Sequence, residues 1–188
     1  MRIEILMAKL VNKINKIKIK TNRMLHSFWI TKINECQIGI SPCPAGGVDL
    51  KIELEKIVLE DQLLLISLLT EEEIIQLKLH DEKLISEELR INFKEFPIVD
   101  SSIPGVVSFI NFIEKIYSLT NKFDRILIHC QAGIGRSSLI ALGLMTKHRL
   151  ILKESIKLAS SIRGFEVPQS RSQLKLLHYY AESLFKLI

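Results

Sequence analysis

The 188-residue sequence predicts an α/β fold, in which a central and mostly parallel sheet is flanked by helices on both faces. Short apolar runs alternate along the chain with longer amphipathic segments, as expected of strands and helices that succeed one another. The run at residues 63–69 is apolar except for Ser67, which is typical of a strand buried on both faces of a parallel sheet. A composition of 47% hydrophobic and 25% charged residues is that of an ordinary globular domain.

The domain is predicted to begin with a β-hairpin. Residues 28–30 and 37–40 have the composition of strands, and they flank a turn near residue 34. A loop rich in proline and glycine follows at residues 41–47. The amphipathic pattern after this loop predicts a helix at residues 48–60.

After the buried strand, Thr70 is expected to cap a helix. Glu73 follows three residues later and completes a capping-box pattern, while the acidic residues 71–73 complement the positive end of the helix. This acidic run therefore has a structural explanation without catalysis. A second helix near residues 81–88 and a strand at residues 91–96 are expected to follow.

The second half of the chain is predicted to be mostly helical. Helices are expected at residues 104–120, 138–145 and 152–163, and Gly164 should end the last of these. A short buried strand at residues 125–128 precedes the second of these helices. The final helix should pack on the core through an apolar stripe formed by Leu174, Leu177, Tyr180, Leu184 and Leu187.

The most informative stretch is the strand-to-helix turn at residues 129–138. A helix N-terminus carries unpaired N–H groups and partial positive charge, so it can bind an anion. Gly133 and Gly135 let successive N–H groups converge, and Arg136 can clamp two oxygens of a phosphate. The same surroundings favour the thiolate form of a cysteine, which makes Cys130 the expected nucleophile. The predicted phosphate-binding residues are Gln131, Ala132, Gly133, Ile134, Gly135 and Arg136.

This stretch resembles the signature loop of the cysteine-dependent protein tyrosine phosphatase and dual-specificity phosphatase superfamily. The spacing from Cys130 to Arg136 alone would be weak, because rhodanese-like and arsenate-reductase loops also pair a cysteine with a nearby arginine. Neither of these has the whole string His-Cys-x-x-Gly-x-Gly-Arg-Ser found here. The resemblance implies a phosphatase catalytic domain with that fold at residues 24–188. Residues 41–44 also loosely resemble the entry of the kinase-associated phosphatase subgroup.

Residues 96–104 resemble the mobile general-acid loop of the same phosphatases. The resemblance places Asp100 as the acid that protonates the leaving oxygen, a step that contributes about 10²–10⁴ in rate. The alternative is that Asp100 caps the next helix or forms a turn, but its place 30 residues before Cys130 favours the acid. No Trp-Pro pair directly precedes Asp100, which favours the smaller dual-specificity branch.

The resemblance implies hydrolysis of a phosphomonoester in two steps, with no metal and no cofactor. Cys130 would attack phosphorus while Asp100 protonates the leaving oxygen, which gives a phosphocysteine. Water would then attack this intermediate with Asp100 acting as base. Arg136 and the N–H groups of the loop would stabilise the charge on the phosphoryl oxygens in the transition state.

Four further residues take supporting roles by the same resemblance. Ser137 would hydrogen-bond the sulfur of Cys130 and stabilise it as a leaving group. Gln169 would position the hydrolytic water, and Gln173 would lie alongside it. His129 is not expected to act as a base, because neighbouring side chains of a strand point to opposite faces. In the family, this histidine tunes the loop through hydrogen bonds.

Most of the net charge of +5 lies in a predicted basic amphipathic extension at residues 1–23. This segment has seven basic residues against Glu4, a charge of +6, which leaves −1 for residues 24–188. A near-neutral domain argues against nucleic acid as a partner. The segment could contact an anionic membrane or a partner protein, but a solvated extension or a helix packed on the domain is the simpler interpretation. Its apolar stripe consists of Ile3, Leu6, Leu10, Ile14 and Ile17.

The cysteine content indicates a reducing compartment. Cys36, Cys43 and Cys130 form neither a metal-ligand pattern nor an even-numbered disulfide framework. A thiolate enzyme works best where thiols stay reduced, so a cytoplasmic location is expected. No run of about 18 apolar residues and no secretory signal is found. Cys43 could be a redox partner of Cys130, although a packing role is the simpler interpretation.

The expected partner is a phosphoprotein substrate that carries phosphotyrosine, with phosphoserine and phosphothreonine as further targets, and the chain is expected to be monomeric. Phosphoinositides and RNA 5′ ends are alternative substrates for the same chemistry. The loop residues Gln131, Ala132 and Ile134 include no lysine, which disfavours highly anionic head groups. A phosphopeptide-binding module without catalysis is the third alternative, and the intact Cys130 and Arg136 argue against it.

Overall fold

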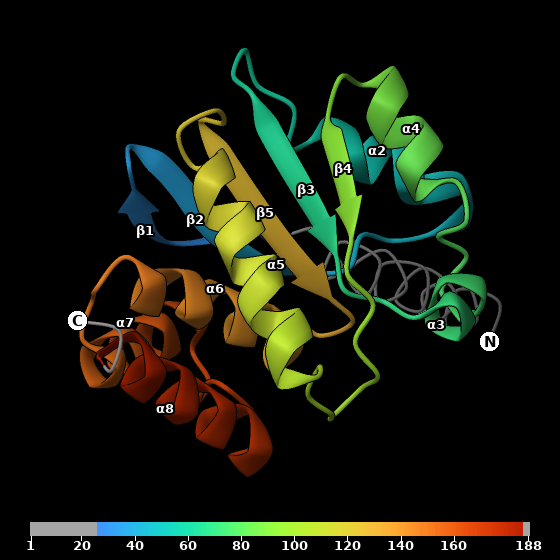
Figure 1. Ribbon diagram of the computed structural model, residues 1–188. Helices are drawn as coiled ribbons and strands as arrows, with labels where there is room; N and C mark the ends of the chain where they lie inside the picture. The colour runs from blue at the N-terminus through green and yellow to red at the C-terminus, as the bar shows by residue number, and fades with distance from the viewer. Residues whose placement is uncertain (1–25, 186–188) are drawn as a thin grey trace, which may run out of the picture.

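The computed structural model describes residues 26–185, in which five strands form one sheet with helices on both faces (Figure 1). The strand order is β1-β2-β5-β3-β4, with β1 antiparallel to β2 and all other neighbours parallel. The predicted fold class is therefore confirmed. The strands are β1 (Phe28–Ile33), β2 (Cys36–Pro42), β3 (Leu63–Ser67), β4 (Asn92–Glu95) and β5 (Arg125–Cys130).

The helices pack against the two faces of the sheet and form two separate cores. Along β5, Ile126 and Ile128 face the first core, which contains residues of α5, α6 and α8, whereas Leu127 faces the second core. Since β3 and β5 are fully buried, the apolar composition of residues 63–66 and 126–128 is explained. The helices are α2 (Leu50–Glu55), α3 (Glu71–Gln76), α4 (Glu82–Glu88), α5 (Val106–Leu119), α6 (Arg136–Lys147), α7 (Leu152–Arg163) and α8 (Arg171–Phe185), with a 3-10 turn η1 (Gly47–Asp49) before α2.

Two predicted helix ends have the expected capping. The side chain of Thr70 accepts a hydrogen bond from the N–H of Glu73, and the Glu73 carboxylate accepts one from the N–H of Thr70, so the predicted capping box is confirmed. Gly164 follows α7 with a φ of 75°, a left-handed conformation that glycine adopts without strain. Both ends are determined by residues within one turn of the chain.

The helix predicted at residues 48–60 is wrong in length, because the regular helix α2 ends at Glu55. The carbonyl of Ile57 accepts a hydrogen bond from Nη2 of Arg125 at 2.9 Å, and Nη2 also donates to Asp61 Oδ1 at 2.6 Å. Arg125 is buried, so it requires these acceptors. The chain after Glu55 therefore turns to surround the guanidinium instead of continuing as a helix.

Helix α8 begins at Arg171, earlier than the apolar stripe indicated, so Gln173 lies in its first turn and not in a loop. The N–H of Gln173 donates to Ser170 Oγ and the N–H of Ser170 donates to Gln173 Oε1, each at 3.2 Å. This Ser-x-x-Gln sequence is a second capping box. Leu187, the last member of the predicted stripe, lies outside the described residues.

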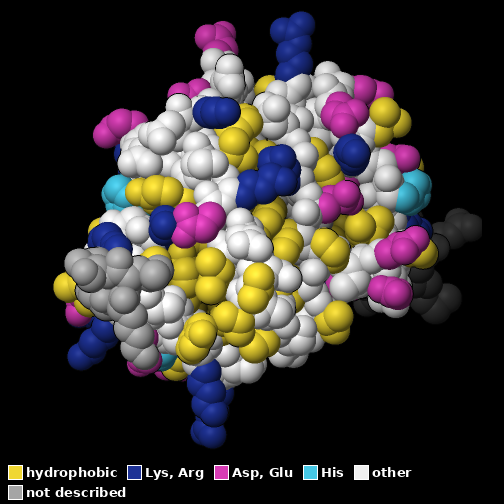
Figure 2. Space-filling model, in the orientation of Figure 1, with side chains coloured by type: hydrophobic (Ala, Val, Ile, Leu, Met, Phe, Trp, Pro, Cys, Tyr) yellow, Lys and Arg dark blue, Asp and Glu magenta, His cyan; other side chains and the backbone are white. Residues whose placement is uncertain are grey.

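The predicted extension at residues 1–23 also lies outside the described part of the chain. Within residues 26–185, none of the helices is both long and apolar enough to cross a membrane. On the face shown in Figure 2, basic and acidic side chains are interspersed, in keeping with the small net charge of residues 24–188.

We predict that Arg125→Met lowers the free energy of unfolding by about 2–4 kcal/mol, because breaking a buried ion pair leaves its partners without compensation. The Arg125 side chain is 7% exposed and that of Asp61 is 27% exposed. As a matched control, Lys51→Met breaks the exposed pair with Glu88 and should cost no more than about 1 kcal/mol. Urea unfolding of both variants measures this difference, and equal losses would contradict the prediction.

Candidate active site

The predicted nucleophile lies where β5 ends. Cys130 is the last residue of β5, the loop at residues 131–135 follows, and α6 begins at Arg136. The Cys130 sulfur is 3.3 Å from the N–H of Gly133, which donates to it, and 3.5 Å from Ser137 Oγ. Cys130 is only 2% exposed, and these two groups are the hydrogen-bond partners of its sulfur among the described residues. The structure therefore brings Cys130 and Ser137 together inside the loop.

Gly133 has a position that only glycine can occupy. Its φ is +67°, and a Cβ atom there would lie 2.5 Å from the backbone N of Pro42 and from the carbonyl carbon of Ser41. The loop is therefore pressed against the end of β2, the strand beside β5. This close approach lets the N–H of Gly133 turn toward the Cys130 sulfur.

Arg163 of α7 holds the outer side of the loop, and the sequence analysis missed it. Its Nε and Nη2 donate to the carbonyls of Gly133 and Ala132, each at 2.8 Å. Because these carbonyls point to Arg163, the N–H groups of the same peptides are free to point inward. The guanidinium lies over the rings of Phe28 and Phe165, at 4.4 and 5.1 Å from their centroids. Its burial lowers the Arg163 pKa, and the nearby Cys130 acts in the opposite direction.

Arg136 is almost fully buried and its guanidinium is held from several sides. Glu73 accepts two hydrogen bonds from it, at 2.6 Å from Nη1 and 2.7 Å from Nη2, and the carbonyl of Ile98 accepts another at 2.8 Å. Nε of Arg136 is buried and has no hydrogen-bond partner among residues 26–185. Burial lowers the Arg136 pKa, but Glu73 and Cys130 raise it by more, so the net shift is upward. The guanidinium is thus a fixed positive charge with one unused donor.

Glu73 has a second role that the capping pattern did not reveal. Burial raises the pKa of its carboxyl, but hydrogen bonds from Arg136 and Thr70 outweigh this and hold the pKa below its usual range. One carboxylate therefore both caps α3 and orients Arg136. The only sequence signal was the capping box itself, because Glu73 and Arg136 are 63 residues apart.

Asp100 lies beside the arginine and does not cap a helix. Its Oδ1 is 3.1 Å from Nη2 of Arg136, and its side chain is 62% exposed. The N-cap residue of α5 is Gly105, with no side-chain cap, so the capping alternative for Asp100 is wrong. The loop that carries Asp100 is attached to β3 through the hydrogen bond from the N–H of Ile98 to the carbonyl of Leu68, at 3.1 Å.

Both predicted glutamines lie against the loop. A Cβ atom on Gly135 would be 3.2 Å from Gln169 Oε1 and 3.3 Å from Gln173 Nε2. Gln169 is exposed, whereas Gln173 is 1% exposed and donates through Nε2 to the carbonyl of Ser102 at 3.4 Å. Gln173 therefore joins the start of α8 to the loop that carries Asp100.

The remaining cysteines are held as thiols. Burial and the negative charge of Asp124 raise the pKa of Cys36 to about 12. The pKa of Cys43 is also raised to about 12, mainly by burial and then by the charges of Glu82 and Cys130. The redox partnership between Cys43 and Cys130 is the less favoured alternative, and a pKa this high makes Cys43 a poor attacking thiol, in keeping with the packing role.

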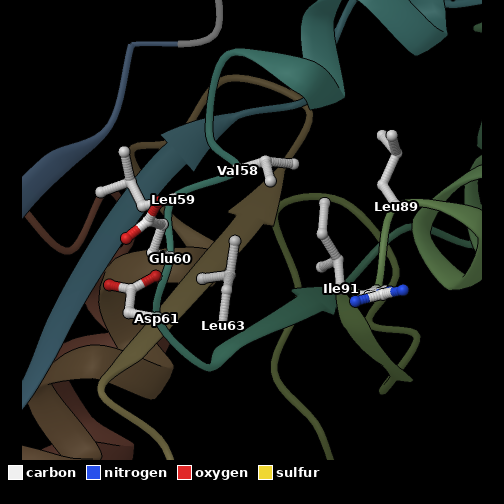
Figure 3. A pocket seen from close by; sticks show the side chains of 8 residues that line it. Val58, Leu59, Glu60, Asp61, Leu63, Leu89 and Ile91 are labelled. Carbon is white, nitrogen blue, oxygen red and sulfur yellow. The ribbon is translucent and has the colours of Figure 1, made fainter.

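A hollow of about 360 Å³ lies at the opposite end of the strands, where the parallel strands begin (Figure 3). It is next to the starts of β3 and β4, whereas Cys130 is at the carboxyl end of β5. Its wall combines apolar and charged side chains, and one of its carboxylates, that of Asp61, is engaged by Arg125. The lining residues include no cysteine, serine or histidine that could act as a nucleophile. Its lining residues are Val58, Leu59, Glu60, Asp61, Leu63, Leu89, Arg90 and Ile91.

Comparison with known proteins agrees with this geometry. A family model described as cyclin-dependent kinase inhibitor 3 (CDKN3) matches residues 53–161, more than half of the chain. Human cyclin-dependent kinase inhibitor 3 is 29% identical over 90 residues, which are 47% of this chain and 42% of that protein. Dual specificity protein phosphatase 1-A of Xenopus laevis is 32% identical over 99 residues, which are 52% of this chain and 27% of that protein. The chain thus spans less than half of the length of these two relatives.

The fold is also that of known phosphatases. A crystal structure of kinase associated phosphatase, with serine in place of its catalytic-site cysteine, matches with a TM-score of 0.75 and 19% identity, over 86% of this chain and 97% of that one. The predicted superfamily is confirmed. The match over residues 53–161 shows that the chain belongs to the cyclin-dependent kinase inhibitor 3 (CDKN3) family, within the dual-specificity phosphatases.

Proposed function

We propose that residues 24–188 form a catalytic domain that hydrolyses phosphomonoesters through a phosphocysteine, without a metal or a cofactor. The observation that carries the proposal is the position of Cys130 in a loop that ends at the buried Arg136. The Cys130 sulfur accepts a hydrogen bond from the N–H of Gly133, and Oδ1 of Asp100 is 3.1 Å from Nη2 of Arg136. Nucleophile, cation and acid thus converge at the carboxyl edge of one sheet.

In the first step, the Cys130 sulfur attacks phosphorus and the bond to the leaving oxygen breaks. Asp100 donates its proton to that oxygen, which prevents the release of a high-energy alkoxide or phenoxide. The phosphoryl oxygens lie against the loop N–H groups and the unused Nε–H of Arg136. Since these donors are already oriented, little reorganisation is needed as charge moves onto the oxygens.

In the second step, water attacks the phosphocysteine and the sulfur leaves. Asp100, now a carboxylate, accepts a proton from the water. Gln169, which lies beside Gly135, orients this water for attack. The hydroxyl of Ser137, 3.5 Å from the sulfur, stabilises the thiolate that is released. Gln173 supports this arrangement through its bond to the acid loop.

The substrate class proposed is a phosphoprotein, with phosphotyrosine first and phosphoserine or phosphothreonine next. The relatives by sequence are a kinase inhibitor protein and dual-specificity phosphatases, which supports this class. Phosphoinositides and RNA 5′ ends are disfavoured, because Gln131, Ala132 and Ile134 bring no cation into the loop. A phosphopeptide-binding module would have no need of Asp100 beside Arg136. The monomeric state and the cytoplasmic location stay predictions.

We predict that Cys130→Ser abolishes the turnover of an aryl phosphate, because the serine hydroxyl is not ionised at neutral pH. Arg136→Lys should lower kcat/KM at least about 100-fold, since lysine cannot replace the planar guanidinium that Glu73 and Ile98 hold. Steady-state kinetics with vanadate as inhibitor measure both effects. Activity that survives in Cys130→Ser, or that is lost on adding a chelator, would contradict the mechanism.

The acid role of Asp100 can be tested by measuring how kcat depends on the basicity of the leaving group. Asp100→Asn keeps the shape of the side chain but cannot protonate the leaving oxygen. We expect kcat to fall by about 10²–10⁴ for poor leaving groups and much less for nitrophenolate, which needs no proton. A series of aryl phosphates of graded leaving-group basicity measures this dependence. An equal loss across the series would exclude the acid role.

The link between Glu73 and Arg136 gives a further prediction. Glu73→Gln replaces two charge-assisted hydrogen bonds with weaker ones, and should lower kcat/KM about 10- to 100-fold. Glu72→Gln removes the same charge from an exposed position of α3 and should leave kcat/KM nearly unchanged. Equal kinetics of the two variants would contradict a specific role of Glu73.

The same pair predicts a pH dependence of stability. Because the folded-state pKa of Glu73 lies below the usual glutamate value, its carboxylate stabilises the fold fully above that usual value. The contribution is lost as the pH falls through the lowered pKa. The difference in free energy of unfolding between wild type and Glu73→Gln should therefore be largest near pH 7 and shrink below about pH 4. Urea unfolding across this range measures it, and a constant difference would argue against the ion pair.

A further inference from the structure

Behind the strand that ends in Cys130 lies a cluster of buried polar side chains that the proposed reaction does not use. Each of them is at most 2% exposed, and each has at least one side-chain atom without a hydrogen-bond partner among residues 26–185. Such atoms are uncommon in folded proteins, so a group of them in one place needs an explanation. The members of the cluster are Ser41, Ser67, Glu82, Ser86 and His129.

The sheet register explains why these residues meet. Ser41 of β2 and Ser67 of β3 are the direct neighbours of His129 on β5, so the three side chains form a row on one face of the sheet. Leu65 and Leu127, two residues earlier on their strands, belong to the core on the side of α2 and α4. The row therefore faces that side, from which α4 supplies Glu82.

The central contact of the cluster joins two ionisable side chains. Nε2 of His129 is 3.1 Å from Oε1 of Glu82, and the side chains are 0% and 3% exposed. The ring N–H is not well enough aligned with Oε1 to form a regular hydrogen bond, so the contact is chiefly electrostatic. A buried carboxylate is costly unless a donor faces it. Among the members of the cluster, only His129 can provide an N–H for Glu82.

The cluster is connected to the catalytic loop by position and by charge. His129 directly precedes Cys130, and its carbonyl accepts a hydrogen bond from the N–H of Leu68 at 3.0 Å. Cys43 lies between the cluster and the loop. Its N–H donates to the carbonyl of Gln131 at 3.3 Å, and the charges of Glu82 and Cys130 both raise its pKa. Glu82 and the Cys130 sulfur therefore both lie near Cys43, although their side chains are on opposite sides of the sheet.

We propose that Glu82 is a positioning residue for the catalytic loop: its carboxylate holds His129 with the proton on Nε2, and the fixed ring keeps the end of β5, and so Cys130, in place. A carboxylate can only accept, so Nε2 must carry a hydrogen. Nδ1 then carries no hydrogen, and Ser41 and Ser67 are the residues paired with His129 on the neighbouring strands. The catalytic meaning of this arrangement rests on the function proposed above.

The reactivity of Cys130 toward iodoacetate tests the proposal without any phosphate. Alkylation near neutral pH should be about tenfold slower in Glu82→Gln, because a displaced sulfur loses the hydrogen bonds of Gly133 and Ser137 that favour its thiolate. Glu87→Gln removes the same charge from an exposed position of α4 and should react like wild type. Mass spectrometry identifies the modified residue. The high pKa of Cys36 and Cys43 keeps these thiols unreactive.

The sign of the change in alkylation rate distinguishes a positioning role of Glu82 from a direct effect of its charge on the thiolate. Loss of a negative charge near a thiolate would favour the thiolate and speed alkylation. Faster alkylation in Glu82→Gln, or the same rate as in Glu87→Gln, would therefore overturn the proposal. His129→Gln should slow alkylation to a similar degree, and the double variant should be no slower than either single one. Additive losses would show that Glu82 does not act through His129.

The tautomer of His129 can be measured in the wild-type protein, with a variant needed only to assign the signal. In ¹⁵N-histidine NMR spectra at neutral pH, Nε2 of His129 should be the protonated nitrogen, with His129→Gln used to assign its signal. A ring protonated on Nδ1 alone would overturn the proposal, since Nε2 could not then donate to Glu82. If the alkylation and NMR results agree with the proposal but no phosphate ester is hydrolysed, the positioning role stands and the proposed function fails.

Discussion

A buried guanidinium held by one carboxylate is the interaction on which the candidate site depends. Arg136 is 2% exposed, and an uncompensated charge at such a position would cost several kcal/mol. Glu73 offsets this cost with two short hydrogen bonds, and the same carboxylate accepts the N–H of Thr70 at the start of α3. The guanidinium of the predicted phosphate-binding residue is therefore held by the same carboxylate that caps α3. The position of Arg136 thus depends on the position of α3.

Most of the fold could be predicted because its determinants are local. The capping box of Thr70 and the left-handed Gly164 each act within one turn of the chain, and the apolar residues 63–66 of β3 reflect burial on both faces. The predicted helix at residues 48–60 was too long because its end depends on Arg125, nearly 70 residues away, which takes the carbonyl of Ile57. The early start of α8 at Arg171 had a local signal, the second capping box, whose glutamine the sequence analysis assigned to a catalytic loop.

In the candidate site, too, the residues of one contiguous stretch could be predicted, whereas those supplied by distant helices could not. The loop from Cys130 to Arg136 is contiguous, so its residue types and spacing could be interpreted directly. Arg163 and Glu73, which orient its carbonyls and its guanidinium, come from α7 and α3, and in the sequence they look like ordinary charged residues of amphipathic helices. Their roles follow from where these helices pack against the sheet. No local pattern contains that information.

The alternation of side chains along β5 assigns different environments to two consecutive residues. Cys130 faces the loop and the N-terminus of α6, where N–H groups and a hydroxyl surround its sulfur. His129 faces the opposite side, where Glu82 of α4 approaches to 3.1 Å. Because one backbone carries both side chains, a shift of His129 on the α4 side of the sheet would also displace Cys130, the predicted nucleophile. In our proposal, the position of Cys130 therefore depends on both faces of the sheet, and α4 supports it through Glu82.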